Sequence, residues 1–198
     1  MIKDIPPKAS VAERLKVLRN AIGLTRKEME ANHNVKSASL ISWEKSHRIP
    51  KKDKVELLVS IFKNYGISCT ADWILNGNGS NPLEQAAKNP EETYLLQEIS
   101  RFQSFYKDSL VIEVEDQSMS PWINTGDFVG GVFVDPKEEK IFINQISIVK
   151  IRGFGTQIRL VKKSSNDQLY NLTSFSNKGD ILNVELEAVA RIVFLRKK

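Results

Sequence analysis

The 198-residue chain has little of what disulfide-bonded, metal-binding and membrane proteins require. It contains one cysteine, Cys69, so it cannot form an intramolecular disulfide, which fits a reducing compartment. No run approaches the roughly 18 apolar residues of a membrane span, and the N-terminal segment has no apolar core of signal-peptide length. The two histidines, His33 and His47, have no partners at metal-ligand spacing. We therefore expect a cytoplasmic protein with no membrane partner, no metal site and no cofactor.

The composition is that of a soluble globular protein. Hydrophobic residues make up 41% of the chain and charged residues 27%, and the length suffices for one large domain or two small ones. The net charge of +5 permits an anionic partner, although many soluble proteins carry as much charge.

The chain divides into two halves of different character. Residues 1–76 predict an all-α domain of about five helices, because apolar residues recur at helical spacing and glycines end the runs VAERLKVLRNAIG and KVELLVSIFKNYG. Residues 77–107 predict a linker, rich in Asn, Gly and Pro at its start, with a helix at about 91–106. Residues 108–198 predict a mainly-β domain, with strands in LVIEV, DFVGGVFV, QISIVKI, TQIRLVKK, QLYNLTSF and EAVARIVFL.

The helix expected at about 91–106 carries an apolar stripe formed by Leu95, Ile99, Phe102 and Tyr106. This stripe is compatible with two arrangements. It could cover a cleft or a dimer partner, or it could pack on its own domain.

A stretch of the helical half has the layout of a DNA-reading motif. Two short helices joined by a tight turn suit the major groove, and GLTRKEMEANHNVKSASLISWEKSHRIP has this arrangement. It resembles the helix-turn-helix of the phage CI/Cro repressors in its GLT start, in Ala31, in the turn residue Val35, and in SWEK followed by a proline. Asn34 stands where that family often has glycine, and asparagine tolerates the left-handed conformation that such a turn needs.

The resemblance implies roles for individual residues. Trp43 matches a buried core position of the family, and Glu44 with Arg19 matches a structural salt bridge. The side chains of the second helix are small, so their direct readout of the bases would be modest. A serine can donate a hydrogen bond to a base edge or accept one from it, and an alanine can touch a thymine methyl group. The residues at base-reading positions are Lys36, Ser37, Ala38 and Ser42, and those placed to meet phosphates are Thr25, Arg26, Lys45 and Arg48.

A second motif lies in the β-rich half. SMSPWINTGD, preceded by a helix-turn-helix and followed by strands, resembles the C-terminal domain of LexA and the cleavable phage repressors, which share their β fold with signal peptidases. The family motif is Ser-Met followed by Gly-Asp, matched here by Ser118, Met119, Gly126 and Asp127. In that family the serine is the nucleophile of a Ser-Lys dyad, so Ser118 is the candidate catalytic residue.

A serine nucleophile needs a base, and the family takes it from a lysine on a later strand. In the matching segment TQIRLVKK, Arg159 occupies the position of that lysine. Arginine cannot serve, because its guanidinium stays charged and has no lone pair to accept the proton. Lys162 points to the opposite face of the strand, Lys163 lies ~13 Å further along it, and Lys150 is on the preceding strand.

The cleavage site is also missing from the sequence. Cleavable relatives carry an Ala-Gly or Cys-Gly pair between the two domains, and residues 77–117 contain neither. Ser118 is therefore interpreted as vestigial, with Arg159 at the lysine position.

These features predict a phage CI/LexA-type transcriptional repressor that binds double-stranded operator DNA. One helix-turn-helix buries too little surface for tight binding, so we expect a homodimer or higher homo-oligomer formed through the β domain, whose last strands, in EAVARIVFLRKK, are candidate interface material. Without self-cleavage, release from DNA would come from an antirepressor protein. The rival hypothesis is an active self-cleaving switch that uses Ser118 with Lys162 or Lys150. A toxin–antitoxin regulator would share the helical domain but would not need the β domain.

Overall fold

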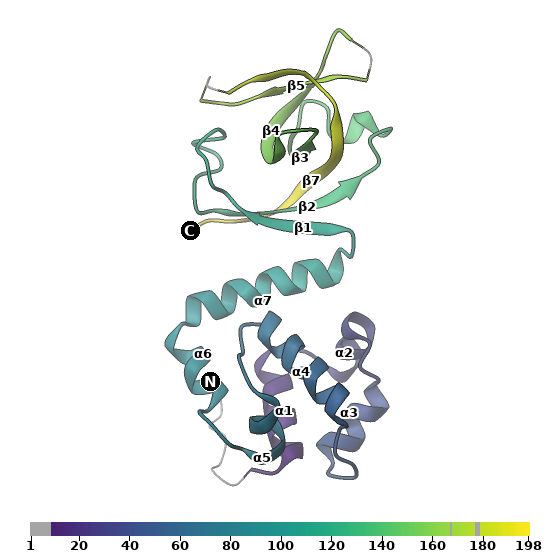
Figure 1. Cartoon of the computed structure of the whole chain (residues 1–198), viewed down its shortest axis with the longest axis vertical. Helices are drawn as coiled ribbons and strands as arrows, with labels where there is room; N and C mark the ends of the chain where they lie inside the picture. The colour runs from purple at the N-terminus through teal and green to yellow at the C-terminus, as the bar shows by residue number, and fades with distance from the viewer. Residues whose placement is uncertain (1–8, 167, 177–178) are drawn as a thin grey trace. The chain divides into compact units, whose positions relative to one another are not determined.

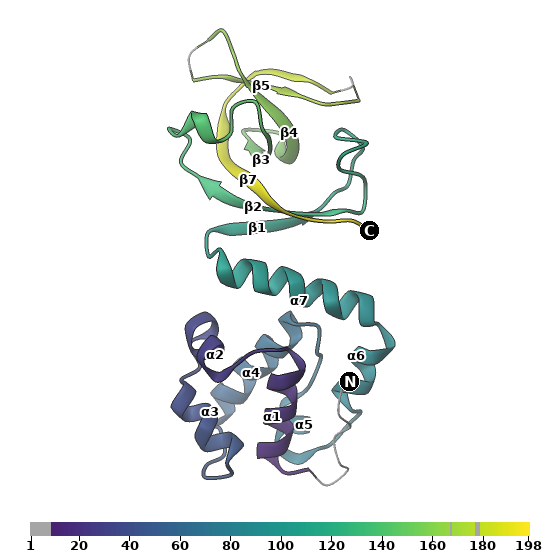
Figure 2. The same cartoon turned by 180° about the vertical axis from the view of Figure 1, so that it is seen from behind.

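The chain forms two compact units, and the boundary along the chain falls between Ser104 and Phe105. The computed structural model describes residues 9–166, 168–176 and 179–198, so residues 1–8 of the expected first domain lie outside the described part. Figures 1 and 2 show that the first unit is helical and that the second is built on a β-sheet. This confirms the predicted fold class of an all-α domain followed by a mainly-β domain.

The described part of the first unit contains seven α-helices, of which the first five occupy the segment where about five were expected. Their bounds are α1 Val11–Ala21, α2 Arg26–His33, α3 Ser37–Glu44, α4 Lys52–Asn64, α5 Ala71–Asn76, α6 Pro82–Lys88 and α7 Pro90–Phe105.

Two capping boxes fix where α1 and α2 begin. The Ser10 hydroxyl accepts a hydrogen bond from the Glu13 amide, and the Glu13 carboxylate accepts one from the Ser10 amide at 2.7 Å. Thr25 and Glu28 repeat the arrangement at the start of α2. Each box satisfies two amides that the first helical turn leaves without partners.

The segment expected as a linker contributes to the helical unit. Leu83 and Ala86 of α6 are buried in the same core as Leu18, Ile22 and Phe62. The sequence had not indicated α6, because PLEQAAK is short and lies among Asn, Gly and Pro residues.

Helix α7 lies across the end of α4, as the views in Figures 1 and 2 agree. The hydroxyl of Ser100 donates to the Asn64 carbonyl at 2.5 Å, and the Ser104 hydroxyl lies 3.2 Å from that of Tyr65. These contacts attach the C-terminal half of the helix to the rest of the α-helical unit.

The second unit contains an antiparallel seven-stranded sheet in the order β1-β2-β7-β3-β4-β5-β6. Six strands coincide with those expected, whereas β6 was missed because ILNV is short and lacks a clear apolar alternation. The bounds are β1 Ser109–Glu113, β2 Phe128–Val134, β3 Ile146–Ile151, β4 Gly155–Lys163, β5 Tyr170–Thr173, β6 Ile181–Val184 and β7 Leu186–Arg196.

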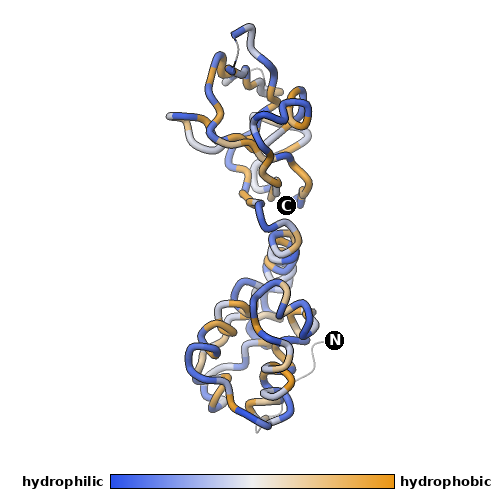
Figure 3. Tube along the Cα trace, turned by 90° about the vertical axis from the view of Figure 1, so that its right-hand side faces the viewer, coloured by the Kyte–Doolittle hydropathy of each residue, from blue (hydrophilic) through white to orange (hydrophobic). Residues whose placement is uncertain are grey.

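Strand β3, in the middle of the sheet, is largely buried on both faces. On β3, Ile148 belongs to one apolar cluster and its neighbour Val149 to another, because successive side chains point to opposite faces. Figure 3 shows the resulting mixture of hydrophobic and hydrophilic stretches along the tube. The loop between β1 and β2 covers the first cluster with Met119 and Ile123, and this packing positions the neighbouring Ser118.

Candidate functional site

The turn between α2 and α3 has the geometry that a helix-turn-helix requires. Asn34 ends α2 in the left-handed conformation, with φ of 54° and ψ of 31°. Val35 follows with 3% of its surface exposed and anchors the turn in the core. On α3, Leu40 and Glu44 are buried one turn apart, so this side of the helix faces inward and the opposite side faces solvent.

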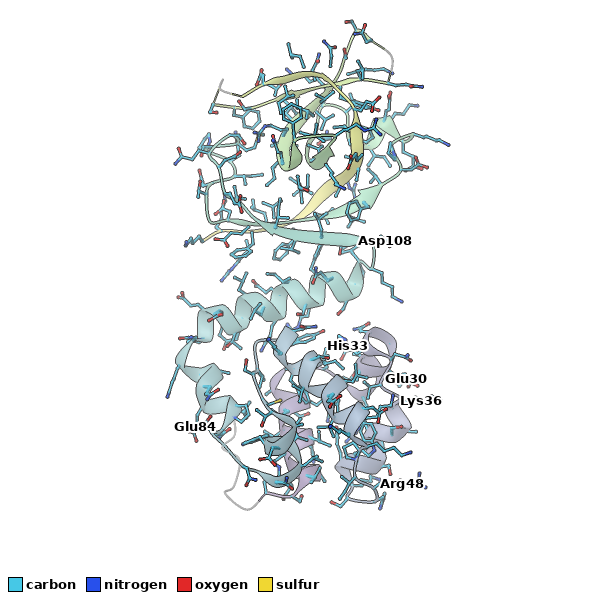
Figure 4. All side chains as sticks on the ribbon, in the orientation of Figure 1. Glu30, His33, Lys36, Arg48, Glu84 and Asp108 are labelled. Carbon is cyan, nitrogen blue, oxygen red and sulfur yellow. The ribbon has the colours of Figure 1, made fainter. Side chains whose placement is uncertain are left out.

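The outward side of α3 carries the residues expected to read bases. Ala38 is exposed, and Ser37 and Ser42 are partly exposed. Lys36 precedes the helix and Arg48 lies in the turn after it, and Figure 4 shows both on the side of the helical unit away from α6.

The residues expected to meet phosphates are placed differently from one another. Lys45 and Arg48 are exposed, and neither forms an ion pair with another described residue. Thr25 is exposed and caps α2, and it remains accessible at the start of that helix. Arg26, by contrast, donates two hydrogen bonds to Glu44, at 2.9 and 2.5 Å. Two of its donors are therefore already engaged within the protein.

Glu44 is the centre of a buried charge cluster. Its side chain has 0% exposure and lies 2.6 Å from Nε of Arg19 and 2.5 Å from Nη2 of Arg26. Two guanidinium groups thus neutralise the acid of α3, and the pairing expected between Glu44 and Arg19 is present. The cluster ties α1 and α2 to α3 and so fixes the orientation of α3.

Two aromatic or imidazole groups near the motif have structural roles. Trp43 is partly buried against the core of the unit, on the flank of α3. His33 ends α2 and lies 3.1 Å from the hydroxyl of Tyr65, and burial lowers the pKa of its imidazole.

Sequence reasoning did not single out Ile41 as a surface residue of α3. Its side chain is 38% exposed although isoleucine is usually buried. The signal was its spacing, three residues after Ala38 and four before Lys45, which places all three on neighbouring positions of one helix face.

Ser118 is held by a carboxylate two residues before it. Its hydroxyl donates to Oδ1 of Asp116 at 2.6 Å, and its amide donates to the same oxygen at 3.0 Å. Its carbonyl accepts from the Phe175 amide at 2.7 Å. Ser118 itself is 7% exposed. Asp116 was missed in the sequence, where an aspartate two residues before a serine is the local signal for this turn.

Arg159 occupies the space beside the Ser118 hydroxyl. It lies on β4 opposite Ser147 of β3, and its Nη1 donates to Oγ of Ser118 at 2.5 Å. The same nitrogen donates to the Ile158 carbonyl at 2.7 Å and lies 3.4 Å from Asp116. Nε of Arg159 is buried and has no hydrogen-bond partner among the described residues.

The cluster does not supply an effective base. Burial opposes ionisation of Asp116, but the hydrogen bonds from Ser118 and the charge of Arg159 outweigh it and lower the pKa of the carboxyl. A carboxylate with a lowered pKa has a weaker affinity for the serine proton. Arg159 donates to the serine and cannot accept from it.

The lysines that could replace the missing base are either paired with an acid or exposed on the other face of the strand. Lys150 pairs with Glu187 at 2.9 Å, and Lys163 pairs with Glu139 at 2.8 Å. Lys162 is exposed on β4, three residues from Arg159 and on the opposite face of the strand.

The end of the Ser118 loop is fixed by Asp127, which is 3% exposed. Its carboxylate accepts hydrogen bonds from the Asn124 amide at 2.9 Å, from Nζ of Lys197 at 2.8 Å and from the Lys198 amide at 3.2 Å. Burial opposes its ionisation, and these bonds outweigh it, so the pKa of Asp127 is lowered. Gly126 precedes it with a φ of +89°, a conformation that favours glycine.

Within the described residues, no group of three or more His, Cys, Asp or Glu side chains could hold a metal ion. Burial raises the pKa of the Cys69 thiol to about 12, so this cysteine stays protonated at neutral pH. Over the same part of the chain, no helix is long and apolar enough to cross a membrane.

Comparisons with known proteins give little further information. No protein-family model and no curated protein matches the chain. Among solved structures, it is similar to the P22 c2 repressor protein in its complex with the synthetic operator 9T in the presence of Tl+, at 18% sequence identity. The match covers 36% of this chain and 100% of that chain, with a TM-score of 0.31, which is too low to support a functional argument.

Proposed function

We propose that the protein is a sequence-specific DNA-binding transcriptional repressor of the phage CI type. The observation that carries the proposal is the outward side of α3. It presents small side chains for base edges, with Lys45 and Arg48 exposed beside them, while the acid of the helix, Glu44, is buried and neutralised. Such a surface suits the negatively charged major groove.

The proposal is tested by selecting a duplex from a random library with the full chain and then measuring affinity at several salt concentrations. Lys45→Gln and Arg48→Gln should each weaken binding and reduce the salt slope by roughly 0.9, because each removes one phosphate contact. Lys88→Gln on α6 removes an exposed lysine away from α3 and serves as the matched control. Failure to select any sequence would contradict the proposal.

Ser37→Ala and Ser42→Ala test direct readout. Each should cost roughly 1–3 kcal/mol on the selected duplex and little on random DNA, because base contacts carry the sequence information. Equal losses on both kinds of DNA would show that α3 is not the recognition helix.

We further propose that the β unit is a degenerate peptidase-like domain that does not cleave. This is supported by Ser118, whose proton is directed to Asp116 and whose oxygen accepts from Arg159. The competing function, self-cleavage with Lys150 or Lys162, would require one of these side chains to leave its present environment and replace Arg159.

Assembly through the β unit completes the proposal. Val193 and Leu195 of β7 are 38% and 44% exposed and lie two residues apart on one face of the strand, so they form an apolar surface that a second copy of the chain could cover. Val193→Asp should shift the protein towards the monomer in sedimentation, whereas Leu182→Asp on β6 should not. An antirepressor protein that binds the repressor would then release it from the operator.

A further inference from the structure

An exposed apolar side chain lies in the middle of the outward side of α3. Ile41 is 38% exposed, and its helical neighbours on this side are Ala38, three residues before it, and Lys45, four residues after it. The three residues form a stripe that is apolar at its start and cationic at its end. The fully buried side of the helix is formed by Leu40 and Glu44, not by Ile41.

We infer that Ile41 is a specificity-determining residue that contacts the C5-methyl group of a thymine in the operator half-site. This inference rests on the proposed function and identifies one base that the repressor reads. The thymine methyl is an apolar group in a major groove that otherwise presents hydrogen-bonding groups. An isoleucine makes no hydrogen bond, so it favours thymine at its position and disfavours the polar edges of the other bases.

The surroundings of Ile41 favour DNA over a protein partner. Lys36, Lys45 and Arg48 surround the stripe with positive charge at both ends of α3. The acid of the helix, Glu44, has 0% side-chain exposure and is paired with Arg19 and Arg26. An apolar centre with a cationic border, without an exposed acid on the helix, is complementary to a methyl group between two phosphate backbones.

The inference is tested with the full chain and the duplex obtained by selection. Each thymine of the half-site is replaced in turn by deoxyuridine, which removes the methyl group and keeps the base pair. At one position per half-site, the replacement should weaken binding of the wild-type protein roughly five- to tenfold. Ile41→Ala should weaken binding to the unmodified duplex by a similar factor and should lose nothing more from deoxyuridine at that position.

The coupling between the two changes separates this contact from general damage. Alanine has a higher helix propensity than isoleucine, so Ile41→Ala should preserve α3, which circular dichroism at 222 nm checks. Leu182→Ala, another exposed aliphatic residue but on β6, should keep the full penalty for deoxyuridine.

The outcomes distinguish this inference from the proposed function. A selected duplex that shows no sensitivity to deoxyuridine, or an Ile41→Ala protein that retains the sensitivity, would overturn the role of Ile41 and leave DNA binding intact. If no sequence is selected, the proposed function fails and this inference fails with it.

Discussion

Nη1 of Arg159 lies 2.5 Å from Oγ of Ser118, and both residues are more than nine-tenths buried. A neutral lysine at this place could take the serine proton. Here the neighbour is a permanent cation that donates to the oxygen. Asp116 accepts the serine proton in a hydrogen bond but has a lowered pKa, so the geometry holds the serine without activating it.

The first prediction is that the purified protein does not cut itself. After long incubation at alkaline pH, where a lysine base would become neutral, gel electrophoresis should show the intact chain. Ser118→Ala should be indistinguishable from the wild type in this assay and in DNA affinity. Fragments split between residues 77 and 117 that disappear in Ser118→Ala would contradict the prediction, and Lys162→Ala would be the next variant to examine.

The second prediction concerns the stability of the Arg159 cluster. Arg159→Met should cost only about 1 kcal/mol of unfolding free energy, although it removes a buried cation. The reason is that the side chain of its partner Asp116 is 56% exposed, so water can solvate the carboxylate once the guanidinium is gone. The change also removes a buried guanidinium nitrogen without a partner. Calorimetric unfolding of the full chain would measure this, and a loss above 3 kcal/mol would contradict it.

The third prediction is that Glu44→Gln is much more damaging. It should cost about 3 kcal/mol, because it leaves the buried Arg19 beside a group that can no longer neutralise it. The matched control is Arg26→Gln, whose side chain is 35% exposed and whose loss leaves the Arg19 pair in place. Unfolding in denaturant, followed at 222 nm, should show a clearly smaller loss for the control. Equal losses would mean that the three charges act as one unit.

The fourth prediction is a pH dependence from His33. Burial lowers the pKa of its imidazole, so the unfolded chain binds this proton more readily than the folded chain. The contribution to stability is complete above the unfolded pKa, near 6.5, and is lost as the pH falls through that value towards the folded pKa. Melting of the helical unit should therefore become easier between pH 7 and pH 5.

His33→Gln should flatten this dependence, since glutamine does not titrate. His47→Gln is the control, because His47 is exposed in the turn after α3 and should leave the slope unchanged. The result that rules out His33 as the source is an undiminished slope in His33→Gln.

Much of the fold is encoded by short-range signals that the sequence shows directly. The start of α2 follows from Thr25 and Glu28, which are three residues apart and form a capping box. Strands β3 and β4 follow from β-branched runs ended by turn residues. The short elements α6 and β6 could not be predicted from the sequence. Each has only a few apolar residues, and the core that these residues cover is known only from the structure.

By itself, the sequence determined the order of the longer elements, the helix-turn-helix layout and the absence of a lysine at position 159. Only the tertiary structure decided which charges meet. Asp116 and Arg159 are 43 residues apart, and they come together because the loop packs Met119 into the core that also contains Ile158 of β4. The same holds for Arg26, which the sequence offers as a phosphate contact and the fold pairs with Glu44. Local patterns depend on the spacing along one element, whereas the partner of a charge depends on the packing of elements far apart in the chain.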